Sequence, residues 1–478
     1  MVESEAFLEG QDYLCNFYRY KLYDKETKHY LLTTDDGAFS FLSSSAFRQL
    51  RRGKIQDKEI FEQLVSRGLI LTSDNISHVV AKTAQRYAFL SNGTSLHIVI
   101  PTSRCNLGCS YCFASPDRID ADREKTDLTP ETALKIIDFI MSSPAKAATI
   151  EFQGGEALAR FDLLQLMTKR ARELNLVAKK VLRITLVTNL VLMTESMAAW
   201  LIDNDVSICT SFDGPKQVHD KNRVVRLKER DDIGTYDTVS RWIFKLQNMY
   251  KERGLSGEVG AIMTTSRYSL PYYKEIIDEY IAHNLSVIDL RSLTYVGEAT
   301  KKEHADLLYE QGEFIEFYKK ALAYLRELNE RGNPIFDRLE RMFETKVLEN
   351  KPTYHADYES PCGAATGQIT YHSNGDIYTC HEALGRDEFK IGNVYGDSWR
   401  DIFGKPQTAK AILNSMLEQN VLCDRCVYKP YCGTCMVENF YHFKKFHYYP
   451  TKTFKHHETQ FHANRLFDSV FEDVKRAL

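Results

Sequence analysis

The feature that most constrains this chain is the segment Cys105-Asn-Leu-Gly-Cys109-Ser-Tyr-Cys112, which places three thiols on one short loop. The loop follows Leu96-His-Ile-Val-Ile100, an apolar run typical of a buried strand. Three thiolates so close together can bind three corners of a [4Fe-4S] cube and leave the fourth iron open to an exogenous ligand. Electron-transfer clusters and structural zinc sites normally have four protein ligands. The alternatives are therefore a zinc loop with a distant fourth ligand, or three unrelated cysteines.

Length and composition fit a globular protein with metal-binding thiols. Its 478 residues, 43% of them hydrophobic, are enough for two or three domains. The net charge of -3 gives no basic field for duplex nucleic acid. Without a signal-like amino terminus or a long apolar segment, we expect a soluble cytoplasmic protein with no membrane or nucleic-acid partner. Of the eleven cysteines, only Cys15 and Cys209 lie outside two tight groups, and both are expected to be core residues.

Residues 1–75 are predicted to form a small winged-helix-like domain, followed by a linker at 76–94 with a helical piece around 81–90. Aromatic and β-branched runs at 18–23, 30–34 and 38–42 predict strands, and two short helices follow. Three interpretations remain open: a peptide-binding element whose partner adds a strand to the sheet edge, a DNA-reading winged helix, and a structural cap. Acidic residues interleaved with basic ones on the second helix argue against DNA.

Residues 95–300 alternate predicted strands and helices. The strands are expected at 96–100, 148–153, 183–188, 206–211, 257–264 and 287–293. The first intervening helix begins at Pro130, with Thr129 as its N-cap. Repeated βα units predict a parallel sheet with helices outside, and six strands are too few for a closed eight-stranded barrel. The α/β fold class is therefore a partial (β/α)6 barrel, with its reactive groups at the carboxyl ends of the strands.

Polar motifs follow three of these strands. They are Gly154-Gly155-Glu156, Thr188-Asn189, and Ser211-Phe-Asp213-Gly-Pro215 with the later His219-Asp-Lys-Asn-Arg223. Glycines let the backbone approach a ligand closely, a carboxylate can receive an ammonium group, and hydroxyls with a guanidinium suit ribose and a carboxylate. Taken singly, each motif is also an ordinary turn.

A helical connection is predicted at 301–350, and a second thiol-rich domain at 351–478. Its cysteines are Cys362, Cys380, Cys423, Cys426, Cys432 and Cys435. These six thiols predict either structural zinc ribbons or auxiliary iron-sulfur clusters. Two fully ligated cubes need eight thiolates, so either some ligand positions are open or non-cysteine, or only one cluster assembles. The candidate substitutes are His381, Glu438, His442 and His447.

Taken together, these motifs resemble the radical S-adenosylmethionine (SAM) superfamily with a SPASM extension. The resemblance implies that Cys105, Cys109 and Cys112 hold a [4Fe-4S] cluster whose open iron binds SAM. It implies cofactor contacts from Tyr111, Gly154, Gly155, Glu156, Thr188, Asn189, Ser211, Asp213 and Arg223, with Tyr111 against the adenine and Glu156 at the methionyl amine. In the extension, Cys362, Cys380 and Cys435 would serve an inner auxiliary cluster, and Cys423, Cys426 and Cys432 an outer one.

The segments Ile208 to Pro215 and Cys426 to Gly433 resemble most the His-Xaa-Ser system maturases, and the amino-terminal domain resembles a leader-peptide recognition element. This likeness implies a 5'-deoxyadenosyl radical that takes hydrogen from a ribosomally synthesised precursor peptide and so installs an intramolecular cross-link, with a reductant such as flavodoxin or ferredoxin. The alternatives are oxidation or epimerisation of a peptide residue without a ring, and a non-enzymatic iron-sulfur regulator. Sulfatase-maturing relatives have an acidic base after the cysteine equivalent to Cys380. Here His381 follows it, which argues against formylglycine formation and leaves His381 or Glu382 as general base.

Overall fold

A small amino-terminal domain forms the first unit of the chain. The computed structural model describes residues 13–226, 234–353, 356–446 and 467–475 except 469 and 473. The domain has a three-stranded antiparallel sheet and two helices: β2 (Tyr18–Asp24), β3 (His29–Thr34), β4 (Phe39–Ser43), α1 (Ser44–Arg51) and α2 (Lys58–Ser66). Ser43 and Asp57 cap the two helices by accepting hydrogen bonds from backbone N–H groups. β1 (Leu14–Cys15) pairs with β5 (Ile70–Leu71) beside an apolar core of the domain's own.

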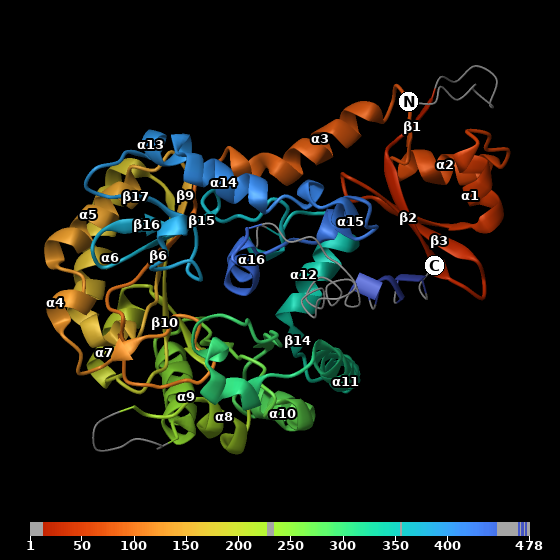
Figure 1. Cartoon of the computed structure of the whole chain (residues 1–478). Helices are drawn as coiled ribbons and strands as arrows, with labels where there is room; N and C mark the ends of the chain where they lie inside the picture. Colours follow the sequence, from red (N-terminus) through yellow and green to blue (C-terminus); the bar gives the residue numbers. More distant parts are fainter. Residues whose placement is uncertain are drawn as a thin grey trace.

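A single helix, α3 (Ile76–Tyr87), leads from this domain to the rest of the molecule. It begins five residues before the predicted helical piece, and a short 3-10 helix (Ala88–Leu90) follows it. None of its residues is buried. In Figure 1 it runs diagonally between the amino-terminal domain and the main body. The predicted linker is therefore largely helical.

One continuous eight-stranded sheet forms the main body, in the order β12-β11-β10-β9-β6-β15-β16-β17. Its barrel strands are all parallel: β6 (Leu96–Val99), β9 (Ala147–Phe152), β10 (Val181–Thr188), β11 (Ser207–Ser211) and β12 (Gly260–Ile262). Helices lie between these strands in sequence and pack on the sheet through a shared apolar core: α5 (Pro130–Met141), α6 (Phe161–Ala178), α7 (Glu195–Asp203) and α9 (Tyr236–Glu252). Figure 1 shows α5, α6 and α7 along the outer side. The predicted partial barrel is confirmed.

Strands from the carboxyl-terminal region extend the same sheet. β15 (Gln368–Tyr371) runs parallel to β6, and a meander of β16 (Asp376–Tyr378) and β17 (Lys390–Asn393) follows. The accompanying helices are α13 (Trp399–Gly404), α14 (Pro406–Asn414), α15 (Val421–Asp424) and α16 (Met436–Phe443). The region predicted as a second domain is therefore joined to the barrel by backbone hydrogen bonds.

The sixth predicted strand is shorter than expected and pairs outside the main sheet. β13 (Val287–Ile288) pairs in parallel with β14 (Phe336–Asp337). β14 lies between α11 (Gln311–Glu330) and α12 (Arg338–Val347), in a segment predicted to be only helical. The buried carboxylate of Asp337 stabilises this arrangement, because it accepts hydrogen bonds from the Leu290 N–H (2.9 Å) and the Tyr318 hydroxyl (2.7 Å). A two-residue strand is too short to leave a periodic pattern in the sequence.

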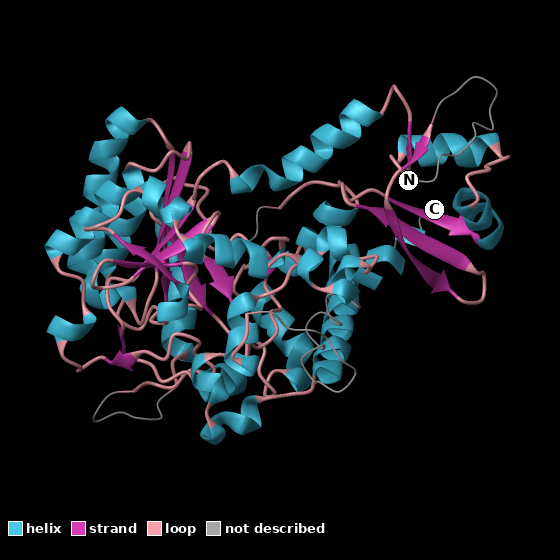
Figure 2. Ribbon diagram, turned by 45° about the horizontal axis from the view of Figure 1, so that its top comes forward, coloured by secondary structure: helices cyan, strands magenta, loops and turns pink. Residues whose placement is uncertain are grey.

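The amino-terminal sheet docks on the loop that carries three of the carboxyl-terminal cysteines. The Thr33 hydroxyl donates to the Val427 carbonyl (2.6 Å), and the Tyr431 hydroxyl donates to the Gly37 carbonyl (3.0 Å). The buried guanidinium of Arg19 forms an ion pair with Asp35 at 2.7 Å. Figure 2 shows this sheet to one side of the main body. None of the helices within the described ranges has the length and apolar character needed to cross a bilayer.

Candidate functional site

The three cysteines of the C-x3-C-x2-C loop line a cavity of about 220 Å³ at the carboxyl ends of β9, β10 and β11. The loop begins at β7 (Arg104–Cys105). The same cavity is lined by eight of the nine predicted cofactor residues, namely Tyr111, Gly154, Gly155, Glu156, Thr188, Asn189, Ser211 and Arg223. These residues are up to 118 positions apart, and the parallel strands bring them to one edge of the sheet.

The chemistry of the three thiols fits a cluster. Burial raises the pKa of Cys109 to about 12, and it also raises the pKa values of Cys105 and Cys112. The Leu107 N–H lies 3.4 Å from the Cys105 sulfur. Buried thiols of this kind stay protonated until a metal cation replaces the proton. Three such donors on one loop suit an iron-sulfur cube with one iron left open.

Glu156 joins the ends of two strands. Its buried carboxylate accepts hydrogen bonds from the Thr188 hydroxyl (2.7 Å) and from the backbone N–H groups of Asn189 (2.8 Å) and Leu158 (3.0 Å). Burial raises the pKa of Glu156. A carboxylate has about four acceptor sites, so one site remains for a further donor such as an ammonium group.

Gly154 and Gly155 pack against the backbone that leads into the cysteine loop. Gly154 has a φ of +125°, and a Cβ there would lie 2.6 Å from the Thr102 carbonyl oxygen. A Cβ at Gly155 would overlap the Arg104 carbonyl. The cysteine loop itself therefore requires these glycines, in addition to any ligand that approaches them.

Asp213 organises two residues of the cavity wall. It accepts hydrogen bonds from the Tyr111 hydroxyl (2.6 Å) and from Nε and Nη2 of Arg223 (3.0 and 3.1 Å). Burial by itself raises the pKa of Asp213, but the Arg223 guanidinium outweighs this effect and keeps that pKa below its usual value. Asp213 is fully buried and is absent from the cavity lining, unlike the other predicted cofactor residues. Its place in the structure is therefore that of a positioning residue behind Tyr111 and Arg223.

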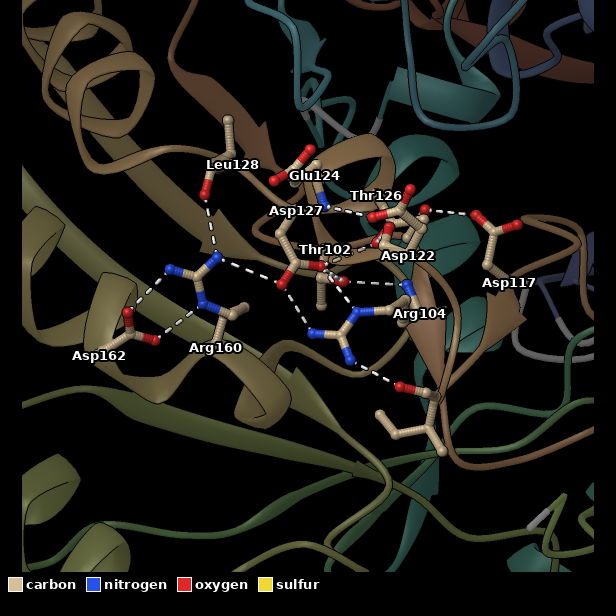
Figure 3. Close-up of polar contacts among 12 residues, drawn as sticks. Thr102, Arg104, Asp117, Asp122, Glu124, Thr126, Asp127, Leu128, Arg160 and Asp162 are labelled. Atoms are coloured by element: carbon tan, nitrogen blue, oxygen red, sulfur yellow. Dashed lines mark hydrogen bonds and ion pairs between the residues drawn. The ribbon is translucent and has the colours of Figure 1, made fainter. Parts of the chain in front are cut away.

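An ion-pair network beneath the cysteine loop was not found from the sequence. Arg104, which precedes Cys105, donates from Nε and Nη2 to the two carboxylate oxygens of Asp127 at 2.8 and 2.7 Å (Figure 3). The Thr102 hydroxyl donates to the same carboxylate at 2.6 Å, and Arg160 reaches it at 3.3 Å. Near the cysteine loop, the sequence shows only that Arg104 precedes Cys105. Its partner Asp127 lies 23 residues further along, so the ion pair has no local sequence pattern.

The six carboxyl-terminal thiols form two groups in the structure. Burial raises the pKa of Cys380, and the nearby Cys435 and Cys362 raise it further; burial likewise raises the pKa of Cys432, to which Cys423 and Cys426 add. No three His, Cys, Asp or Glu side chains within the described ranges converge closely enough to hold one metal ion. A cube binds each thiolate to a different iron, and so it accepts thiols spaced more widely than a single zinc ion does.

His381 and Glu382 follow Cys380 and line the cofactor cavity. The buried His381 ring lies edge-on to Phe113 with ring centroids 4.6 Å apart, and burial lowers the pKa of His381 to about 4. Its imidazole is therefore neutral near pH 7, as a proton acceptor must be.

The proposed substitute ligands lie in different surroundings. Glu438 is half-buried beside Cys435, with its N–H 3.4 Å from that sulfur, and desolvation raises the pKa of Glu438 to about 7. His442 stacks on Tyr295 with ring centroids 4.8 Å apart. His447 lies outside the described residues.

Comparison with known proteins identifies two domains. Residues 99–262 match the radical SAM superfamily, and residues 362–436 match SPASM, an iron-sulfur cluster-binding domain. A cysteine-type anaerobic sulfatase-maturating enzyme of Clostridium perfringens is 23% identical over 357 residues, which cover 71% of this chain and 88% of the relative.

Two solved structures share the fold. Native anSMEcpe with bound AdoMet has a TM-score of 0.63 at 19% identity and covers 80% of this chain and 99% of its own. Streptococcus suis SuiB bound to precursor peptide SuiA has a TM-score of 0.55 at 15% identity, and the match covers 92% of this chain and 99% of SuiB. The cofactors are therefore [4Fe-4S] clusters and SAM, as predicted. The chain is therefore an enzyme that contains a radical SAM domain and, after it, a SPASM domain.

Proposed function

We propose that this enzyme acts in the cytoplasm on a ribosomally synthesised precursor peptide and installs an intramolecular cross-link in it. One observation carries the proposal: His381 and Glu382, which follow Cys380 of the inner auxiliary group, line the same cavity as Cys105, Cys109 and Cys112. A substrate in this cavity lies between the two predicted clusters. Peptides are the ligands of relatives with this fold, since SuiB binds SuiA and anSMEcpe has been solved with AdoMet and a Kp18Cys peptide.

Different residues of the cavity have different roles in this reaction. Cys105, Cys109 and Cys112 would hold the cluster that binds SAM, and together these cofactors would supply the radical chemistry that takes a hydrogen atom from a substrate carbon. Tyr111, Glu156 and Arg223 orient the cofactor, and the surrounding buried side chains exclude water. His381 or Glu382 takes up the proton that ring closure releases.

The balance of a cross-link favours a role for the auxiliary clusters. The peptide loses two hydrogen atoms, one as a hydrogen atom to the cofactor fragment and one as a proton plus an electron. Cys362, Cys380 and Cys435 would hold an auxiliary cluster near this cavity, and its redox chemistry would provide an acceptor for that electron. A flavodoxin or ferredoxin supplies the separate electron that starts each turnover.

The amino-terminal domain binds the leader of the precursor in this proposal. β2 is an edge strand, since its only strand neighbour within the described sheet is β3. Along it, Tyr20 and Leu22 are 48% and 41% exposed. An added strand would satisfy the free backbone edge and cover these side chains.

The test is incubation of the anaerobically reconstituted enzyme with SAM, a reductant and the precursor peptide encoded nearest its gene. Fragmentation mass spectrometry should show the loss of two hydrogen atoms and a missing set of fragment ions inside the ring. An unchanged mass with altered stereochemistry would point to epimerisation, and a linear oxidised product would point to simple oxidation. If no 5'-deoxyadenosine forms, the enzyme neither cross-links this peptide nor modifies one of its residues without a ring.

A further inference from the structure

A second cavity, of about 1,020 Å³, continues from the cofactor cavity into the interior of the barrel. The two cavities share lining residues from the carboxyl ends of the strands, among them Gln153, Val187 and Ile262. The second cavity extends to the opposite ends of the strands, where its lining includes Gly93, Ser95, Lys146 and Gln368. The interior of this barrel is therefore an open chamber, in contrast to the layered side chains that fill a closed barrel.

Glu151 projects into the middle of this chamber. Along β9, Ile150 and Phe152 are buried in the core beneath the helices, and the alternating Glu151 and Gln153 line the cavity. The neighbouring positions on β10 and β11 are Thr185, paired with Glu151, and Cys209. Such small side chains leave space in front of the Glu151 carboxylate.

The Glu151 carboxylate has no cationic partner among the described residues. It accepts hydrogen bonds from the Gln153 amide and from the Thr185 hydroxyl (3.3 Å), both of which are neutral. Other charged groups of the lining are paired, since Arg338 forms an ion pair with Asp289 and Glu359 with Lys346 at 3.2 Å. Arg291, His381 and Glu382 lie where the two cavities meet, and the exposed Lys146 lies at the far opening.

We infer that Glu151 binds a basic side chain of the substrate peptide, an ammonium, guanidinium or imidazolium, beside the residue that is modified. Glu151 lies two positions before Gln153, or about 7 Å further from the cofactor cavity along the strand. A Lys or Arg side chain has the length to span this separation from a backbone held near Gln153. A carboxylate in a partly enclosed chamber forms a charge-assisted hydrogen bond that a neutral side chain cannot replace. This inference rests on the proposed peptide substrate, and it adds the chemical class that the chamber selects.

A binding measurement tests the inference without turnover. The probes are labelled short peptides of Gly and Ser that differ in one central residue, which is Lys, norleucine or Glu. Their affinities for the SAM-loaded, reconstituted full-length enzyme are measured by fluorescence anisotropy. We expect the Lys peptide to bind wild-type enzyme about tenfold more tightly than the norleucine peptide. In Glu151→Gln this preference should fall to less than about twofold, and Glu151→Lys should instead prefer the Glu peptide.

Matched controls separate recognition from folding. Glu252→Gln, at an exposed site on α9, should keep the full Lys preference, and the iron content of Glu151→Gln should equal that of wild type. Equal binding of the Lys and norleucine peptides, no binding of the Lys peptide, or a Lys preference that survives in Glu151→Gln would each overturn the inference. A wild-type preference for the Glu peptide would assign recognition to Arg291 and Arg338 instead. Failure of peptide modification with an intact Lys preference would count against the proposed function alone.

Discussion

Arg104 and Asp127 form a two-pronged ion pair directly beneath the first cysteine of the cluster loop, with N–O distances of 2.8 and 2.7 Å and both side chains 3% exposed. The pair connects the strand that begins the loop to the segment before α5. The position of Cys105 therefore depends on an interaction outside the cavity.

Asp127→Ala should lower the free energy of unfolding by about 3–5 kcal/mol, because it leaves the buried Arg104 guanidinium without its partner. Anaerobic urea denaturation measures the change. The matched control is Asp138→Ala, which removes a surface ion pair with Arg170 and should cost less than about 1 kcal/mol. Equal losses in the two variants would contradict a structural role for the buried pair.

His219 should make stability depend on pH. Its buried ring accepts a hydrogen bond from the Asp213 N–H (3.3 Å) and lies 3.0 Å from the Thr235 hydroxyl, and burial lowers its pKa from 6.5 to about 4. Between these values the unfolded chain binds more protons than the folded one. Stability is therefore complete above about pH 6.5 and is lost as the pH falls toward 4. We expect His219→Gln to show a smaller decrease in unfolding free energy than wild type between about pH 7.5 and pH 5.

Arg223→Lys should weaken SAM binding by about tenfold while leaving the cluster in place, since lysine cannot reproduce the two parallel hydrogen bonds to Asp213. Equilibrium dialysis against labelled SAM measures the affinity, and the iron content serves as the check on the cluster. Lys221→Arg, which changes an exposed cation two positions away, should bind SAM as wild type does. An unchanged affinity in Arg223→Lys would remove this residue from the cofactor site.

Cysteine variants should separate the clusters. Cys105→Ala should lose iron together with the change in the electron paramagnetic resonance spectrum that SAM causes at an open iron. Cys432→Ala should lose iron and keep that SAM-dependent change, whereas Cys15→Ala, in the amino-terminal domain, should keep full iron content. Glu438→Gln provides a further comparison, because a loss of iron there would make Glu438 a ligand of the inner cluster. Loss of the SAM response in Cys432→Ala would contradict the division into separate sites.

Much of the site was predictable from the sequence because its signals are local. The cysteine spacing occupies eight consecutive residues, and each polar motif directly follows a strand whose apolar pattern marks its end. Thr129 and Pro130 predicted the start of α5 correctly, since a cap acts within one helical turn. β14 escaped because two residues leave no periodicity, and the strand predicted at 287–293 is reduced to the two residues of β13.

The sequence by itself determined the two domain types, the cofactors and the residues that meet at the strand ends, because parallel strands bring their carboxyl ends to one edge whatever the details of packing. Only the tertiary structure decided that Asp213 stands behind the cavity, that Arg104 finds Asp127, that β15 joins the barrel sheet, and that Glu151 faces an open chamber. Each of these depends on which distant side chains share a buried volume. Hydrogen bonds and ion pairs across such volumes depend on packing and leave no pattern in the neighbouring residues.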